Sequence, residues 1–364
     1  MKTDPVPASF AAAHRLMRQG IAEKVFPGAV LRVARGLDVL FERAYGVTDC
    51  TTGVPVTPQT CFDLASLTKV LATTPALIKL VQAGALSLDQ PLASILPPFD
   101  QPSKAAITLE QLLRHRSGLP AYRPYFQGLK GHNPAARKKD LNRRLTTEPL
   151  AGPVGRQTVY SDIGFMILRW VVETRTGLRL DRYVDEAVFE PLGIRRLFYV
   201  DVEAHVPLEN PAATEKCPWR HTVIRGVVHD ENAYAVGGVE GHAGLFGDAA
   251  GVHRLLAALL AAYKKEQADV FNPQTVGRFL RVPPGAGRAL GFDTPSTEAS
   301  SSGRFFSSRT VGHLGFTGTS VWMDLARGVI VVLLTNRIHF GRDNDAIRHF
   351  RPVLHDSIMQ RFCA

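Results

Sequence analysis

Hydrophobic and β-branched residues gather in short runs near both ends of the chain and recur at helical spacing between them. Five runs have the length and content of strands: 29–34, 39–44, 310–314, 318–325 and 329–336. Helical patterns cover residues 10–26, 66–75, 76–83, 107–114, 162–176, 180–189 and 346–362. Because the strands lie at both ends and most helices between them, the pattern predicts an α+β fold with one sheet built from both termini.

Proline and glycine mark where the predicted elements end. Pro27 and Gly28 stop the first helix, Pro75 is expected to end or kink the helix before it, and Gly177 is placed to cap another. A single domain is expected over residues 1–364, with a sheet lobe and a mostly helical lobe. The sheet lobe comprises about residues 1–65 and 240–364, and the helical lobe about residues 66–239.

The chain is basic, with 43 lysines and arginines against 33 acidic residues. Many of the cations lie between Arg114 and Arg144, and the stretch 121–150 is expected to be irregular. A nucleic-acid surface would need interleaved aromatic residues or a known module, and neither is found here. The stretch is interpreted as a solvated basic loop or, alternatively, as an attractant for an anionic substrate.

Several classes of protein are not expected from the composition. No apolar run is long enough to span a bilayer, so no membrane partner is expected. Asp4, Pro5 and Pro7 interrupt the N-terminus where a signal peptide would lie, which favours a cytoplasmic location. Neither the four cysteines nor the twelve histidines show local metal-ligand spacing, so no metal and no cofactor are expected. The sequence does not specify an oligomeric state.

Ser66 and Lys69 form a Ser-x-x-Lys pattern at the start of a predicted helix. Three residues are nearly one helical turn, so both side chains leave the same face. A serine hydroxyl is a weak nucleophile until a neighbour accepts its proton or supplies a positive field, and a lysine can do either. The pair therefore makes Ser66 a candidate nucleophile that forms an acyl-enzyme, although so loose a pattern also arises by chance.

Tyr160-Ser161-Asp162 precedes the apolar helix 162–176. A tyrosine near a lysine can be held as a phenolate, because positive charge lowers its pKa, and could then deprotonate Ser66. Asp162 could hydrogen-bond Lys69 or the substrate. Alternatively, Ser161 or Asp162 simply caps the helix.

A third pattern, His313-Leu314-Gly315-Phe316-Thr317-Gly318, lies at the end of a predicted strand. Glycine allows a substrate backbone to lie close to the strand, and an edge strand can bind a peptide through main-chain hydrogen bonds. The amides of Phe316 and Ser66 could together stabilise an oxyanion. In isolation, the pattern favours a glycine-rich turn. The glycine-rich segment 237–247 lacks the lysine of a phosphate loop and is interpreted as a structural turn beside the site.

In this order along the chain, the three patterns resemble those of the serine β-lactamase and penicillin-binding-protein superfamily, in particular its class C-like branch. Two further segments resemble sequences of that branch: Leu112 to Pro120, and Phe189 to Ile194. The resemblance implies a β-lactamase/transpeptidase-like fold, with an antiparallel sheet flanked by helices. It also implies roles: Ser66 as nucleophile, Lys69 as its electrostatic partner and Tyr160 as general base.

The same resemblance places His313 where the family has the lysine of Lys-Thr-Gly, and it assigns the oxyanion hole to the amides of Ser66 and Phe316. The substrate-binding and oxyanion positions are Asp162, Gly315, Phe316 and Thr317. Two departures stand out, because Tyr-Ser-Asp replaces the commoner Tyr-x-Asn and a histidine replaces the lysine. The first adds negative charge beside Lys69, and the second removes a fixed cation at neutral pH, so efficient β-lactamase activity is not expected.

Segments 214–220, 226–233 and 334–337 resemble a subgroup of carboxypeptidase-like proteins and lactamase-fold N-acetylmuramoyl-L-alanine amidases. The resemblance favours a serine hydrolase that acts through an acyl-enzyme on amide bonds of peptidoglycan-derived fragments. A muropeptide or another small molecule would be the substrate. The alternatives are a broad-specificity carboxylesterase, a weak β-lactamase, and a catalytically silent binding protein that keeps the acylation site.

Overall fold

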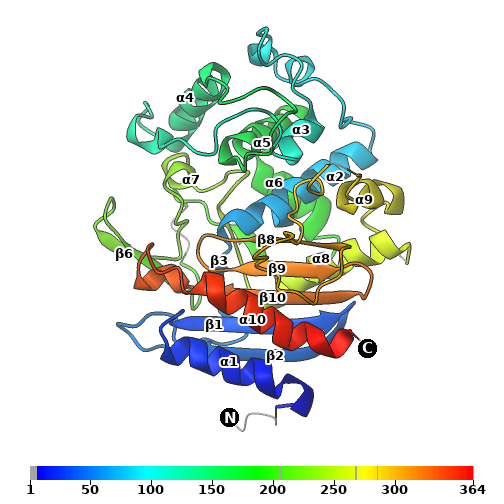
Figure 1. The fold of residues 1–364 in the computed structure, drawn as a ribbon. Helices are drawn as coiled ribbons and strands as arrows, with labels where there is room; N and C mark the ends of the chain where they lie inside the picture. Colours follow the sequence, from blue (N-terminus) through cyan, green and yellow to red (C-terminus); the bar gives the residue numbers. More distant parts are fainter. Residues whose placement is uncertain (1–5, 205–206, 267–268, 285, 364) are drawn as a thin grey trace.

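The computed structural model describes residues 6–204, 207–266, 269–284 and 286–363, so Asp4 and Pro5, which argue against a signal peptide, lie outside the described residues. A five-stranded antiparallel sheet lies at its centre (Figure 1), and each strand pairs with the next in the order β2, β1, β10, β9, β8. These strands are β2 (Asp38–Gly46), β1 (Gly28–Arg35), β10 (Val329–Thr335), β9 (Ser320–Asp324) and β8 (Thr310–Leu314). Because β1 pairs with β10, the predicted sheet from both termini is confirmed.

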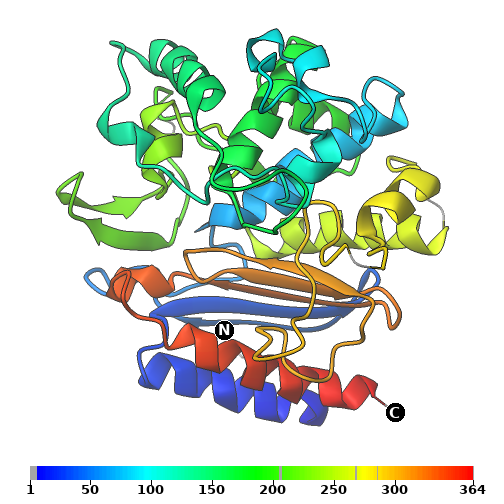
Figure 2. The ribbon, with the colours of Figure 1, turned by 45° about the horizontal axis from the view of Figure 1, so that its top comes forward.

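Helices cover both faces of this sheet (Figure 2). Strand β10 shows why both faces are buried, since its side chains point alternately to the two sides. One set packs with α1 (Ala11–Ala22) and α10 (Ile347–Met359): Val329, Val331 and Leu333. The other set belongs to a core shared with α8 (Ala249–Lys264) and the helical region: Ile330, Val332 and Leu334.

The remaining helices lie mostly on the side of the sheet opposite α1 and α10 (Figure 2). They are α2 (Thr74–Gln82), α3 (Leu109–Leu113), α4 (Pro134–Thr147), α5 (Asp162–Thr176), α6 (Leu180–Val184), α7 (Glu231–Ala235) and α9 (Pro273–Leu280). Gly177 caps α5 in the left-handed conformation, as expected. Among the described residues, no helix is long and apolar enough to span a membrane.

The basic stretch 121–150 is not irregular throughout, contrary to expectation, because α4 occupies its second half. Asn133 caps the helix by accepting a hydrogen bond from the Ala136 amide, and Pro134 takes a first-turn position that needs no N–H donor. Leu141 and Leu145 are its buried leucines, and most other positions are polar. With so few apolar residues on one face, the helical periodicity of this segment could not be recognised in the sequence.

Pro75 does not end the helical segment that follows Ser66, which was one of its two expected effects, but the type of helix changes directly before it. The segment Lys69–Thr73 forms a π-helical turn, and a regular α-helix then begins at Thr74 with Pro75 in its first turn. A proline ring clashes with the carbonyl four residues earlier, and a π turn is one way to accommodate it. The short turn Ala65–Leu67 is of the 3-10 type.

A small second sheet carries the chain into Ser66. Strand β3 (Phe62–Asp63) pairs with β7 (Leu245–Gly247), which also pairs with β4 (Leu197–Tyr199). Two further strands, β5 (Ala213–Cys217) and β6 (Thr222–Arg225), form a separate hairpin. The glycine-rich segment 237–247 therefore ends in β7, the strand that pairs with β3 just before Ser66.

A buried histidine on α10, His355, should make the free energy of unfolding depend on pH. Burial lowers the pKa of His355 from 6.5 to about 4, and its Nδ1 lies 2.8 Å from the Ser301 carbonyl. Below pH 6.5 the unfolded chain therefore binds a proton at His355 that the folded chain does not. The contribution of this residue to the free energy of unfolding must then fall as the pH drops from 6.5 to 4.

His355→Asn tests this contribution, because asparagine keeps a donor for Ser301 but does not titrate. By pH 5, it should avoid about 2 kcal/mol of the wild-type loss, measured by urea denaturation at pH 7 and 5. Identical losses in both proteins would contradict the assignment.

Candidate active site

The Ser66 hydroxyl lies 3.0 Å from Lys69 Nζ, so the structure brings the predicted pair together. Ala65, directly before the serine, has a φ of 47°, a left-handed conformation that is strained for alanine. The buried Asp63 carboxylate holds this turn, because it accepts hydrogen bonds from the amides of Ala65 and His229 at 2.8 and 2.7 Å. The backbone that leads into Ser66 is thus fixed, and it is joined to the segment that contains His229.

Lys69 is fully buried, and its ammonium group contacts three oxygens. These are Ser66 Oγ, Asp162 Oδ1 at 2.7 Å and the carbonyl of His242 at 3.4 Å. Burial opposes the positive charge, but the Asp162 carboxylate and Tyr160 outweigh it and raise the pKa of Lys69 above its usual value. Lys69 therefore carries its proton at neutral pH and supplies a positive field, rather than a free amine, to Ser66.

Tyr160 lies against this ammonium group, with Lys69 Nζ 4.8 Å from the centre of its ring. Burial raises the pKa of Tyr160 and the Asp162 carboxylate raises it further, whereas interactions with Lys69 and Ser66 lower it. The net direction is upward, so the expected phenolate was wrong for the resting site. The sequence suggested both the cation and the carboxylate of Asp162 near Tyr160, but it did not show the burial of the phenol, which is the largest cause of the raised pKa.

The Tyr160-Ser161-Asp162 segment combines the two alternatives that its sequence left open. Ser161 caps α5 by accepting a hydrogen bond from the Gly164 amide at 3.2 Å, and its own hydroxyl donates to the Pro120 carbonyl. Asp162 is the first residue of the helix and binds Lys69. The helix cap therefore sets the position of the carboxylate that keeps Lys69 charged.

His313 lies at the end of β8, with its ring 5.7 Å from that of Tyr160. Burial, Lys69 and Arg288 lower its pKa well below 6.5, so the imidazole is neutral. Nδ1 lies 2.8 Å from the Leu314 carbonyl, which can only accept, so the proton sits on Nδ1. Nε2 is then a buried acceptor without a hydrogen-bond partner among the described residues. The family's lysine position is occupied here by an acceptor rather than a cation.

The turn after β8 is fastened to the segment before Ser66. The Thr317 hydroxyl donates to the Asp63 carbonyl at 2.8 Å, and the Thr319 hydroxyl donates to the Leu64 carbonyl at 3.2 Å. A Cβ atom on Gly315 would lie 2.0 Å from the Thr319 hydroxyl, so only glycine fits there. Thr317 is buried and holds the turn, whereas Gly315 and Phe316 line the cavity beside Ser66.

A cavity of about 650 Å³ joins these residues, and its lining includes further residues that the sequence did not reveal. It is lined by most of the predicted site, including Ser66, Tyr160, Asp162, His313, Gly315 and Phe316. Arg288 also lines it, with its guanidinium 5.8 Å from the Tyr160 ring centre and 3.2 Å from Asp293. No sequence motif surrounds Arg288. The only signal in the sequence is the histidine at position 313, because a site without the usual lysine there could take its positive charge from another residue.

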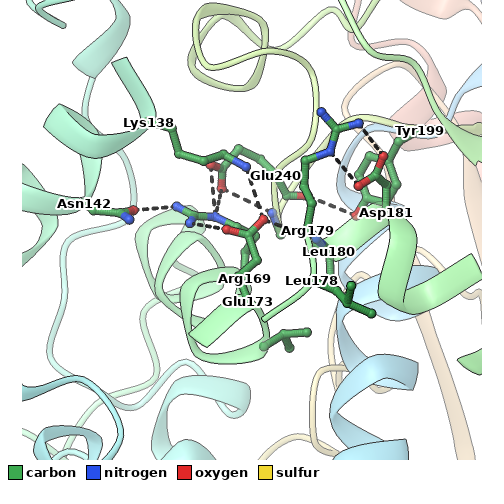
Figure 3. Close-up of polar contacts among 12 residues, drawn as sticks. Lys138, Asn142, Arg169, Glu173, Leu178, Arg179, Leu180, Asp181, Tyr199 and Glu240 are labelled. Carbon is green, nitrogen blue, oxygen red and sulfur yellow. Dashed lines mark hydrogen bonds and ion pairs between the residues drawn. The ribbon is translucent and has the colours of Figure 1, made fainter. Parts of the chain in front are cut away.

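A buried ion-pair network fixes α5 to the glycine-rich segment (Figure 3). Arg169 of α5 contacts Glu240 at 3.2 Å and Glu173 at 2.9 Å, and it donates to the Asn142 side chain of α4 at 2.7 Å. Arg169 and Glu240 are both fully buried. Because Glu240 stands two residues before His242, this network holds the carbonyl that accepts from Lys69.

The glycine-rich segment behaves as the structural turn that was predicted. A Cβ atom on Gly241 would lie 2.1 Å from the Phe165 carbonyl, so glycine lets the segment pack directly on α5. The Thr73 hydroxyl donates to the Gly241 carbonyl at 2.7 Å. His242 itself is paired with Asp230, whose carboxylate raises its pKa against the effect of burial.

The family model described as Beta-lactamase matches residues 13–353. The chain belongs to the beta-lactamase family. An N-acetylmuramyl-L-alanine amidase of Bacillus subtilis (strain 168) is 33% identical over 345 residues, which cover 86% of this chain and 78% of the relative. A protein of Escherichia coli (strain K12) named "Putative D-alanyl-D-alanine carboxypeptidase" is 31% identical over 343 residues, or 86% and 79% of the two chains.

Solved structures of this family share the fold. A penicillin-binding protein homologue from Pyrococcus abyssi superposes with a TM-score of 0.73 at 18% identity and covers 96% of this chain and 76% of its own. A class C beta lactamase from Rhodobacter sphaeroides gives 0.72 at 19% identity over 97% and 99% of the two chains. The predicted β-lactamase/transpeptidase-like fold is thus confirmed.

Proposed function

We propose that this protein is a serine hydrolase that cleaves amide bonds of peptidoglycan-derived fragments through an acyl-enzyme at Ser66. The observation that carries the proposal is the contact between Ser66 and a charged, buried Lys69, beside Tyr160 in an accessible cavity. The names of the two curated relatives support a peptidoglycan fragment as substrate. The intact contacts at Ser66 argue against a catalytically silent binding protein.

The geometry supports a two-step reaction. Ser66 Oγ attacks the carbonyl carbon of the substrate and passes its proton to the Tyr160 oxygen in the deprotonated fraction of that residue. The amides of Ser66 and Phe316 stabilise the resulting oxyanion. The C–N bond then breaks, Tyr160 returns the proton to the leaving amine, and water hydrolyses the ester on Ser66.

Two charged positions in the cavity bear on the substrate. His313 is neutral and cannot hold a lactam carboxylate as a lysine would, which disfavours β-lactamase activity. Arg288 supplies a cation in the same cavity, although it also pairs with Asp293 at 3.2 Å, and it could bind a carboxylate of a peptide. A carboxylesterase is the second candidate, because esters need less activation of the leaving group than amides.

Four substrates separate these candidates when offered to the purified protein in one mass-spectrometric panel. They are a short-chain nitrophenyl ester, a peptide ending in D-Ala-D-Ala, a muramoyl peptide and a labelled penicillin. We expect cleavage of at least one of the two amides and a mass increase on the peptide that contains Ser66. Ester turnover with neither amide cleaved would overturn the proposal in favour of an esterase. No turnover and no adduct would favour the silent binding protein.

Replacement of Tyr160 by phenylalanine should lower kcat by roughly 100-fold while the fold stays intact, because the ring remains and only the proton carrier is lost. The raised pKa of Tyr160 also predicts that log(kcat/KM) of the wild type rises with pH between 6 and 9, as the phenolate fraction grows. Steady-state kinetics across this range test both points. Unchanged turnover in the variant would remove Tyr160 from the role of base.

We further propose that the protein works in the cytoplasm on released fragments rather than on intact wall. Fractionation of cells that produce the full-length chain tests it, and recovery outside the cytoplasm would contradict it.

A further inference from the structure

The guanidinium group of Arg337 binds the main chain of an oxyanion-hole residue. Its Nε and one terminal nitrogen donate to the Phe316 carbonyl, at 3.1 and 2.8 Å. The other terminal nitrogen donates to the carbonyls of Arg342 and Asn344, at 3.1 and 2.5 Å. Arg337 thus connects the turn after β8 to the segment that precedes α10.

Arg337 does not serve as an ion-pair partner. It is 8% exposed, and within the described part of the chain no carboxylate lies within 4 Å of its guanidinium group. Keeping an arginine buried without a counter-ion is unfavourable unless its N–H groups are satisfied by other acceptors. Here main-chain carbonyls satisfy them, those of Phe316, Arg342 and Asn344, although Arg337 also lines the cavity beside Ser66.

The aromatic ring of Phe316 is also held in place, by contacts with two neighbouring side chains. Arg337 lies 5.1 Å from the ring centre, and the ring stacks on His229 at 5.6 Å. His229 in turn donates its amide proton to Asp63, the residue that also binds the Ala65 amide. Although the Phe316 side chain is 46% exposed, both its ring and its carbonyl are therefore tied to the frame around Ser66.

Such a tie matters because glycines flank Phe316. Gly315 precedes it by one residue, and Gly318, with a φ of 109°, follows two residues later. The peptide that carries the Phe316 N–H is already held on its other side, because the Gly315 carbonyl accepts a hydrogen bond from the Gly318 amide at 3.0 Å. The next peptide carries the Phe316 carbonyl, and beside a glycine-rich turn its orientation is free to change unless another group holds it. A rotation there would displace Phe316, turn its N–H away from the oxyanion and remove one of the two donors.

We propose that Arg337 is a positioning residue of the oxyanion hole, which holds the Phe316 amide toward the developing oxyanion through its two hydrogen bonds to the Phe316 carbonyl. This inference rests on the proposed acylation of Ser66. It assigns a role to the last residue of segment 334–337, which the sequence singled out without a function.

The test compares Arg337→Met with Arg327→Met. Arg327 is the control, because its guanidinium also donates to a main-chain carbonyl, that of Phe305 at 2.6 Å, at the turn between β9 and β10. It differs from Arg337 in that it also pairs with Asp324, at 3.1 Å. The readouts are kcat and KM for a nitrophenyl ester and the affinity for an alkyl boronic acid, which forms a tetrahedral adduct on serine. Loss of one oxyanion donor costs about 100- to 1,000-fold in kcat, and a misplaced donor should cost less.

For Arg337→Met we expect kcat and boronic-acid affinity to fall together, by about 10- to 100-fold, with KM within about threefold of wild type. Arg327→Met should change none of the three by more than about threefold. If Arg337→Met does not fold, Arg337→Lys replaces it in the test, since lysine keeps the charge but only one hydrogen bond. In that variant kcat and boronic-acid affinity should both fall by about 3- to 10-fold, with KM nearly unchanged. Equal kcat and boronic-acid affinity in the folded Arg337 variant and in Arg327→Met would overturn the inference alone. Absence of acylation in the wild type would overturn the proposed function with it.

Discussion

Replacement of Lys69 by methionine is expected to lower the rate of acylation by roughly 1,000-fold or more. The ammonium group is the shared partner of Ser66, Asp162 and the His242 carbonyl, and it is the cation that lowers the pKa of Tyr160. Without it, the Asp162 carboxylate faces the phenol directly, so the phenolate that should take the serine proton becomes rarer. Stopped-flow acylation by a nitrophenyl ester measures the loss.

Two further variants make the Lys69 experiment specific. Ser66→Ala sets the rate without a nucleophile, and Lys69→Met should come within about tenfold of it. Lys79→Met is the matched control, because Lys79 lies on α2 and donates to the Val270 carbonyl at 2.8 Å, away from the cavity lining. A Lys69 variant that acylates as fast as the Lys79 variant would exclude the ammonium group from catalysis.

Replacement of Arg169 by methionine should destabilise the fold by about 3–5 kcal/mol, the largest stability effect expected here. The change leaves the carboxylate of Glu240 fully buried without its cation. It should also slow acylation, because Glu240 belongs to the segment that presents the His242 carbonyl to Lys69. Urea denaturation at neutral pH gives the first quantity, and ester kinetics on the folded fraction give the second.

Figure 3 also contains the control for this prediction. Arg179 pairs with Asp181 and Asp201 at 2.6 Å, but its side chain is 42% exposed, so Arg179→Met should cost no more than about 1 kcal/mol. Adding Glu240→Gln to Arg169→Met should recover part of the loss, since the orphaned charge is removed. Equal losses for the Arg169 and Arg179 variants would show that burial of the network contributes little.

The features predicted well from the sequence are those that local spacing determines. The three-residue separation of Ser66 and Lys69 places both on one side of a helical turn. Strand β8 was predicted with the bounds that the structure gives it. Helix α4 could also have been predicted, because Asn133 followed by Pro134 is a common helix start, but its few apolar residues concealed the period.

The features missed depend on groups that meet only after folding. The protonation of Tyr160 follows from its burial and from Asp162, and the sequence shows neither the burial nor the distance. Arg288 reaches the cavity from an irregular segment 128 positions beyond Tyr160 with no motif around it. Such placements follow from long-range packing, which periodicity does not encode.

Hydrogen bonds between the two ends of the chain also determine when the site around Ser66 can form during synthesis on the ribosome. Thr317 holds the turn through a hydrogen bond to Asp63, 254 residues earlier, and Asn336 accepts from the amide of Gly28, 308 residues earlier. A nascent chain that already displays Ser66 and Lys69 therefore lacks the partners that hold the turn after β8, which carries the proposed oxyanion donor Phe316. Contacts this distant in sequence form late and slowly. The serine should consequently stay unreactive toward acyl donors until nearly the whole chain has left the ribosome.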